Sequence, residues 1–146
     1  MPRYARMFQL AEEVIEAWHD SLQRGDLEAA ISLWFDEDSV SCVLPDGIRL
    51  TGHSELREGL AGILAPHPIL LDTLSSISHN SMGVAFIDST EAVRFGKEFT
   101  DPALFINMTL ILIQSTEGWR IAHLHASEVS KEHVQAPSFA GDHGFH

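Results

Sequence analysis

The sequence has little cysteine and no long apolar run. Cys42 is the only cysteine among 146 residues, so no disulfide can form within the chain and a zinc site with two cysteines cannot be built in it. No apolar run approaches the ~18 residues of a membrane span, and the N-terminal stretch lacks the apolar segment of a signal peptide. We therefore expect a soluble, cytoplasmic protein without a membrane partner.

Basic residues are also scarce. The chain has 9 Lys and Arg against 21 Asp and Glu, which gives a formal net charge of −12, and no basic cluster occurs along it. Because binding to nucleic acid depends on clustered Lys and Arg, we expect no nucleic-acid partner. The length fits one domain, and folding at this size buries roughly two-thirds of the unfolded surface.

The first half of the chain has the spacing of helices. Apolar residues recur every three or four positions from Met7 to Leu22, which predicts an amphipathic helix. Gly25 is suited to end it and Asp26 to cap a second helix over residues 27–34. A third helix is predicted between His53 and Leu64.

Strand patterns dominate the rest. Residues 40–44 alternate as in a strand before the turn at 45–47. Four longer strand-like runs follow at 69–79, 83–98 (with an interruption near Asp88-Ser89), 104–114 and 119–129. Helices followed by a meander of strands indicate an α+β domain with an antiparallel sheet over residues 1–130. Residues 131–146 have no period, and we expect a mobile C-terminal tail.

The last hairpin can be given a register. The loop "STEG" fits a type I turn with a bulge at Gly118, which pairs Ser115 with Trp119. Counting in steps of two then gives the pairs Ile113–Ile121, Ile111–His123, Thr109–His125 and Asn107–Ser127 on one side of the sheet. The other side is wholly apolar: Met108, Leu110, Leu112, Ala122, Leu124 and Ala126.

The apolar face of this hairpin carries so many aliphatic groups that it must be covered, and two arrangements would cover it. In the first, the helices cover the apolar face and the polar cluster is solvated. In the second, the helices arch over the polar cluster to make a pocket, and a second subunit covers the apolar face.

Three stretches together resemble a known family. "WHDSLQRGDLEAAISLW", "DGIRLTGH" and "GWRIAHLHAS" are similar to the nuclear transport factor 2-like superfamily, in its SnoaL-like branch, over residues 8–129. The resemblance implies a cystatin-like cone, in which a curved antiparallel sheet wraps around three N-terminal helices and an apolar cavity lies at the open end. It also implies a homodimer through the sheet, with the face of His123, His125 and Ser127 lining the cavity.

The superfamily includes ketosteroid isomerases, polyketide cyclases, dehydratases and the association domains of calcium/calmodulin-dependent kinases, so the fold leaves the reaction open. The isomerase mechanism requires a carboxylate base, a tyrosine and a protonated carboxylic acid. The resemblance places these groups at Cys42, Trp18 and within 107–109, where none of them is present. We do not expect a steroid-type isomerase of that mechanism.

His123 and His125 are the candidate catalytic residues, because imidazoles one strand step apart can act as acid and base near neutral pH. Two alternatives remain: a structural hydrogen bond to Thr109 or Ser127, and a metal site, which needs a third ligand. Cys42 is either a nucleophile or a small core residue. The predicted ligand-binding residues are Asn107, Thr109, Ser127, Trp18 and Cys42.

The preferred hypothesis is a domain that binds a small apolar organic molecule. If it is an enzyme, we expect an isomerase, dehydratase or cyclase that uses histidine acid–base chemistry with no cofactor and no metal. The alternative is a non-catalytic module for oligomerisation or ligand binding, since the ending "HLHAS" also resembles that of kinase association domains.

Overall fold

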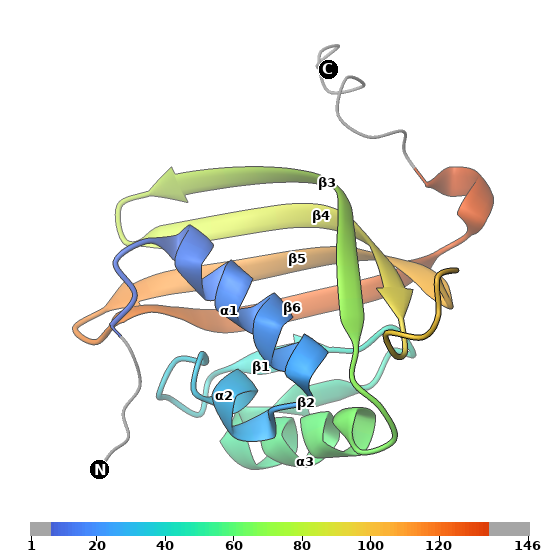
Figure 1. Ribbon diagram of the computed structural model, residues 1–146. Coiled ribbons are helices and arrows are strands. Elements are labelled where there is room, and N and C mark those ends of the chain that lie inside the picture. The colour runs from blue at the N-terminus through green and yellow to red at the C-terminus, as the bar shows by residue number, and fades with distance from the viewer. Residues whose placement is uncertain (1–6, 135–146) are drawn as a thin grey trace.

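The computed structural model describes residues 7–134, in which three helices lie against one six-stranded sheet (Figure 1). The helices are α1 (Ala11–Arg24), α2 (Leu27–Ile31) and α3 (Gly52–Leu64). The strands are β1 (Ser41–Val43), β2 (Arg49–Thr51), β3 (Leu70–Ser81), β4 (Val84–Arg94), β5 (Leu104–Ser115) and β6 (Gly118–Val129). Within the described residues, no helix combines the length and apolar character that crossing a membrane requires.

The sheet is curved, and all three helices lie on its concave side (Figure 1). Its strand order is β2-β1-β6-β5-β4-β3, and every neighbouring pair is antiparallel except β1 and β6, which run parallel. A register shift between Thr73 and Ser75 bends β3 towards the helices, as a β-bulge does. The predicted α+β cone is confirmed.

The N-terminal boundaries follow local capping and one tertiary contact. Gly25 has a φ of 66° and ends α1, and Asp26 Oδ1 accepts a hydrogen bond from Ala29 N at 3.0 Å, both as predicted. The helix begins at Ala11, however, and not at Met7. Phe8 is drawn into the sheet instead, because its carbonyl accepts a hydrogen bond from Trp119 N at 3.0 Å.

Two strand predictions need correction. β2 was assigned to no element, yet Arg49–Thr51 pairs with β1. The strand within 83–98 is limited to Val84–Arg94 and has no break at Asp88-Ser89. Asp88 pairs with Thr109 in the unbroken β4–β5 ladder, and its carboxylate, on the outer face, accepts a hydrogen bond from Thr109 Oγ1 at 2.5 Å.

The predicted hairpin register is correct for the pairs far from the turn and wrong for the pairs next to it. Ser115 pairs with Gly118 and Ile113 with Arg120, which contradicts the predicted pairs. The extra residue is Ala122, which has no partner between Ile121 and His123. Moving the bulge from Gly118 to Ala122 changes only the pairs between them, so the three predicted pairs further along hold: Ile111–His123, Thr109–His125 and Asn107–Ser127.

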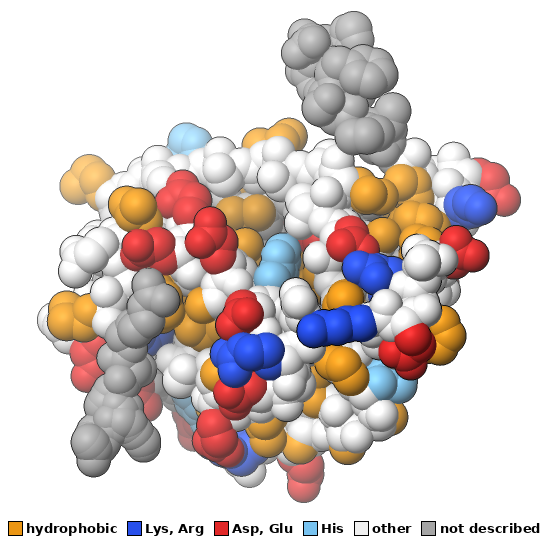
Figure 2. All heavy atoms as spheres, viewed as in Figure 1, with side chains coloured by type: hydrophobic (Ala, Val, Ile, Leu, Met, Phe, Trp, Pro, Cys, Tyr) orange, Lys and Arg blue, Asp and Glu red, His pale blue; other side chains and the backbone are white. Residues whose placement is uncertain are grey.

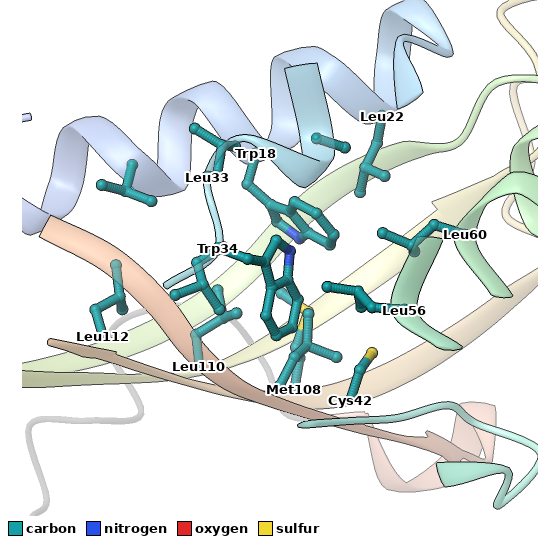
Figure 3. Packing of buried hydrophobic residues seen from close by; sticks show 14 of the residues in the cluster. Trp18, Leu22, Leu33, Trp34, Cys42, Leu56, Leu60, Met108, Leu110 and Leu112 are labelled. Carbon is teal, nitrogen blue, oxygen red and sulfur yellow. The ribbon is translucent and has the colours of Figure 1, made fainter. Parts of the chain in front are cut away.

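The helices cover the apolar face, which we call the inner face of the sheet. Leu110, Leu112 and Ile121 have 0% exposure there. Trp18 of α1 meets Trp34 edge to face, with ring centroids 5.9 Å apart, at the centre of the core (Figure 3). The first of the two arrangements is therefore the one observed, and the opposite, outer face carries the polar cluster. The predicted tail begins with a short 3-10 helix at Lys131–His133, and residues 135–146 lie outside the described part.

We predict that Gly118→Ala destabilises the protein more than Gly83→Ala. Both glycines have positive φ, 93° and 76°, so either alanine costs about 1–2 kcal/mol of backbone strain. A Cβ at Gly118 would also lie 2.7 Å from Phe8 N, whereas one at Gly83 meets nothing within 4 Å. Urea unfolding measures both variants, and equal losses would contradict the close approach of Phe8 to β6.

Candidate functional site

A cavity of about 320 Å³ lies between the helices and the inner face of the sheet. Figure 3 shows Trp18 of α1, Leu60 of α3 and Cys42 of β1 around this part of the core. Other side chains that line it include Leu22, Ile63, Met108, Leu124 and Ala126. Among the described residues that line it, the only carboxylate is that of Asp46, which is exposed. The cavity has the size and apolar character of a site for a small molecule.

Small side chains at two inner positions contribute to this space. Ala126 of β6 and Cys42 of β1 face the helices on neighbouring strands, where longer side chains would extend into the cavity. α3 packs tightly on β2 beside it, since a Cβ on Gly59 would lie 2.4 Å from Leu50 Cδ1. The close packing of α3 on β2 thus limits the cavity on one side, and the small side chains of Ala126 and Cys42 leave its space unfilled on the other.

Trp18 is the only α1 residue in the cavity lining whose side chain carries a hydrogen-bond donor. It is 3% exposed, and its Nε1 has no hydrogen-bond partner among residues 7–134. A buried N–H without an acceptor costs free energy that a ligand oxygen would recover. Trp18 and Cys42 therefore lie where the sequence analysis expected them, and their roles in ligand binding stay predictions.

Cys42 is poorly suited to act as a nucleophile. Its side chain is 1% exposed, and burial in apolar surroundings raises the pKa of the thiol to about 12. The thiolate is the reactive form, so Cys42 is almost wholly protonated near neutral pH. Of its two predicted interpretations, the geometry favours the small core residue.

The other predicted site residues lie together on the outer face and do not line the cavity. His125, Asn107 and Ser127 are exposed there, while His123 and Thr109 are half-buried. The expectation that this face lines the cavity is wrong, because the helices bury the fully aliphatic face of β5 and β6. The predicted register correctly placed these side chains on one face of the sheet, but the resemblance implied that this face lines the cavity.

The two histidines are neighbours with ring centroids 6.3 Å apart. His123 Nδ1 and Ser41 Oγ form a hydrogen bond of 2.7 Å across β6 and β1, so its partner is neither Thr109 nor Ser127. Burial, and then the positive charges of His125 and Arg49, lower the pKa of His123, which leaves it neutral at pH 7. Within residues 7–134 no group of three His, Cys, Asp or Glu is arranged to hold a metal ion.

A buried polar group that was not predicted from the sequence lies on the inner face of β3 and β4. Glu91 is 1% exposed, and its Oε1 accepts a hydrogen bond from Thr73 Oγ1 at 2.8 Å. Ser89 is 8% exposed, and its Oγ has no partner in the described residues. A signal was present, since Ser89 and Glu91 alternate with Thr90 and Ala92 and share the side of Val93.

Comparisons with known proteins agree with this geometry. The model of the SnoaL-like domain family matches residues 11–131. A search of curated proteins gave no match.

Three solved structures show the extent of the likeness. A protein described as a calcium/calmodulin-dependent protein kinase type II association domain, from Thiobacillus denitrificans, is 19% identical with a TM-score of 0.76, over 86% of this chain and 100% of that one. One described as a dehydratase of the NTF2-like family, from Streptomyces avermitilis, is 25% identical with a TM-score of 0.73, over 82% and 93%. An uncharacterised Caulobacter vibrioides protein with a cystatin-like fold is 16% identical with a TM-score of 0.70, over 83% and 88%. Since the family model covers most of the sequence, the chain belongs to the SnoaL-like domain family, within the cystatin-like, NTF2-like fold.

Proposed function

We propose that this domain binds a small apolar organic molecule in the cavity between the helices and the inner face of the sheet. The observation that carries the proposal is the lining, whose described residues are apolar apart from the exposed Asp46. Burial of about 200 Å² of apolar ligand surface contributes roughly 5 kcal/mol before the entropic cost of association. Because about 4 kcal/mol corresponds to a Kd of about 1 mM and about 8 kcal/mol to about 1 μM, these magnitudes give a Kd no tighter than a few tenths of a millimolar for so small a ligand.

The lining argues against acid–base catalysis by histidine within the cavity. His123 and His125 project from the opposite face of the sheet, so neither imidazole can reach a molecule held under α1. General acid–base catalysis requires the catalytic group within hydrogen-bond reach of the transferred proton. One structural neighbour, from Streptomyces avermitilis, is described as a dehydratase, so an enzymatic function has a precedent among proteins of this fold. Any catalytic role of the two histidines in this chain would act at the outer face.

We predict that Ala126→Leu weakens binding of a test ligand such as cyclohexane at least tenfold. The larger side chain extends into the cavity from β6 and takes the space of the ligand. Tryptophan fluorescence reports the titration, because Trp18 lines the cavity. Ser127→Leu is the matched control, since the adjacent residue is exposed on the outer face and should leave the affinity unchanged. Equal affinities for all three proteins would contradict a site in the cavity.

We also predict that Cys42 resists modification in the folded protein. With a thiol pKa raised to about 12, the thiolate population near pH 8 is about a thousandfold below that of an ordinary cysteine, whose pKa is about 8.5. Labelling with a disulfide reagent such as DTNB should therefore be at least a hundredfold slower in buffer than in urea. Rapid labelling of folded protein would instead indicate a reactive nucleophile in the cavity.

A second proposed function is assembly into a homodimer through the outer face of the sheet. Ile77 is 69% exposed, Val84 44% and Phe86 38%, and Ile111 and Ile113 lie beside them half-buried. An apolar patch of this kind on a sheet is typical of an interaction surface. The likeness to the Thiobacillus denitrificans protein described as an association domain supports self-association, and the exposed apolar residues above are the reason to place it on this face.

We predict that the double variant Ile77→Lys and Phe86→Lys is monomeric at a concentration where the unaltered protein is dimeric. The two lysines place like charges on both copies of a two-fold interface, which disfavours association. Analytical ultracentrifugation measures the mass. Met82→Lys is the control, because this 96% exposed residue lies in the β3–β4 turn. A monomeric unaltered protein, or a double variant that stays dimeric, would rule out this face as the interface.

A further inference from the structure

Glu91 is a buried carboxyl group without a cationic partner among the described residues. It lies on the inner face of β4 with 1% exposure, and its only hydrogen bond there comes from Thr73 on the edge strand β3. The neighbouring cation Arg94 pairs with Asp72, at 2.9 Å. Burial of a carboxyl group with so little compensation costs free energy, so a structural role alone explains Glu91 poorly.

Ser89 gives a second, independent indication of a polar site. It is 8% exposed, and its Oγ has no hydrogen-bond partner within residues 7–134. Ser89 and Glu91 are two residues apart on one strand, so their side chains project from the same face of the sheet. A hydroxyl with unused hydrogen-bonding capacity therefore lies beside a carboxyl group with unused acceptor capacity.

Glu91 and Ser89 are next to residues that line the cavity, although they are not part of its lining themselves. Val93, two residues beyond Glu91 on the same face, is part of the cavity lining, and Leu71 holds the equivalent position relative to Thr73. On β5, Ile106 pairs with Glu91 and Met108 pairs with Ser89, and both of these partners line the cavity. A molecule in contact with Ile106 and Val93 is thus one residue step from the carboxyl group.

We propose that Glu91 and Ser89 anchor a hydrogen-bond-donating group of the cavity ligand, so that the ligand is an apolar alcohol or amine and not a plain hydrocarbon. The assignment rests on the proposed ligand-binding function and specifies its ligand class. The carboxyl group already accepts a hydrogen bond from Thr73 Oγ1, and its remaining lone pairs are further acceptor sites that suit a hydroxyl or an ammonium group. The formal net charge of −12 also favours the approach of a cation, and acidic side chains are spread over the face of the molecule seen in Figure 2.

The test uses three ligands of equal heavy-atom number: ethylcyclohexane, cyclohexylmethanol and cyclohexylmethylamine. Each is titrated by tryptophan fluorescence into the unaltered protein, Glu91→Leu and Glu91→Gln. Glu58→Gln, on the exposed surface of α3, is the matched control. Circular dichroism checks the fold of each variant, and Glu91→Gln keeps the test valid if Glu91→Leu does not fold.

We expect Glu91→Leu to lower the affinity for the alcohol and the amine at least tenfold while the hydrocarbon changes less than about twofold. Glu91→Gln should chiefly weaken the amine, because an amide carries no charge, and Glu58→Gln should change nothing. If the alcohol and amine keep their affinities in both Glu91 variants while ethylcyclohexane binds, the anchor is refuted and the apolar cavity function stands. If none of the three ligands binds the unaltered protein, the proposed function fails and the anchor with it.

Discussion

The pairing of β5 with β6 determines the rest of the structure. Side chains alternate across a strand, so the Thr109–His125 pairing sets which residues of both strands share a face. One face then presents Met108, Leu110 and Leu124, whose burial under the helices removes a large apolar area from water. That burial places α1 across the sheet and fixes the position of the cavity. It also leaves both histidines on the opposite side.

Local signals in the sequence were enough for the helices and for most of this register. Gly25 and Asp26 mark the junction of α1 and α2 because each meets a purely local backbone requirement. The start of α1 and the existence of β2 depend on pairing with distant strands, Phe8 with β6 and Arg49–Thr51 with β1, which a local pattern does not encode. The covered face was equally hidden, since Ile111 and Ile113 make the outer face partly apolar as well.

Only part of the candidate site could be predicted from the sequence, for a related reason. The resemblance identified Trp18 and Cys42 as cavity residues. It could do so because it aligns positions along the chain, even where the side chains differ from those of the family. The positions where a steroid-type isomerase needs a tyrosine and a base carry an indole and a protonated thiol, so the cavity keeps its shape without that chemistry. Glu91 was overlooked because a charged residue within a strand is normally read as solvent-facing, and only the sheet geometry shows it buried.

The outer face combines two properties that suit an interface assembled near neutral pH. Exposed Ile77 and Phe86 offer apolar area, and His123 lies on the same face with a pKa lowered first by burial and then by His125 and Arg49. A neutral imidazole is far less costly to desolvate than a charged one, so His123 opposes burial little at pH 7. Acid protonates it and adds charge to a surface that must lose water on association. Because the lowered pKa belongs to the folded monomer, His123 accepts this proton only at a pH below the ordinary histidine value, and a second copy over the face would lower that pH further.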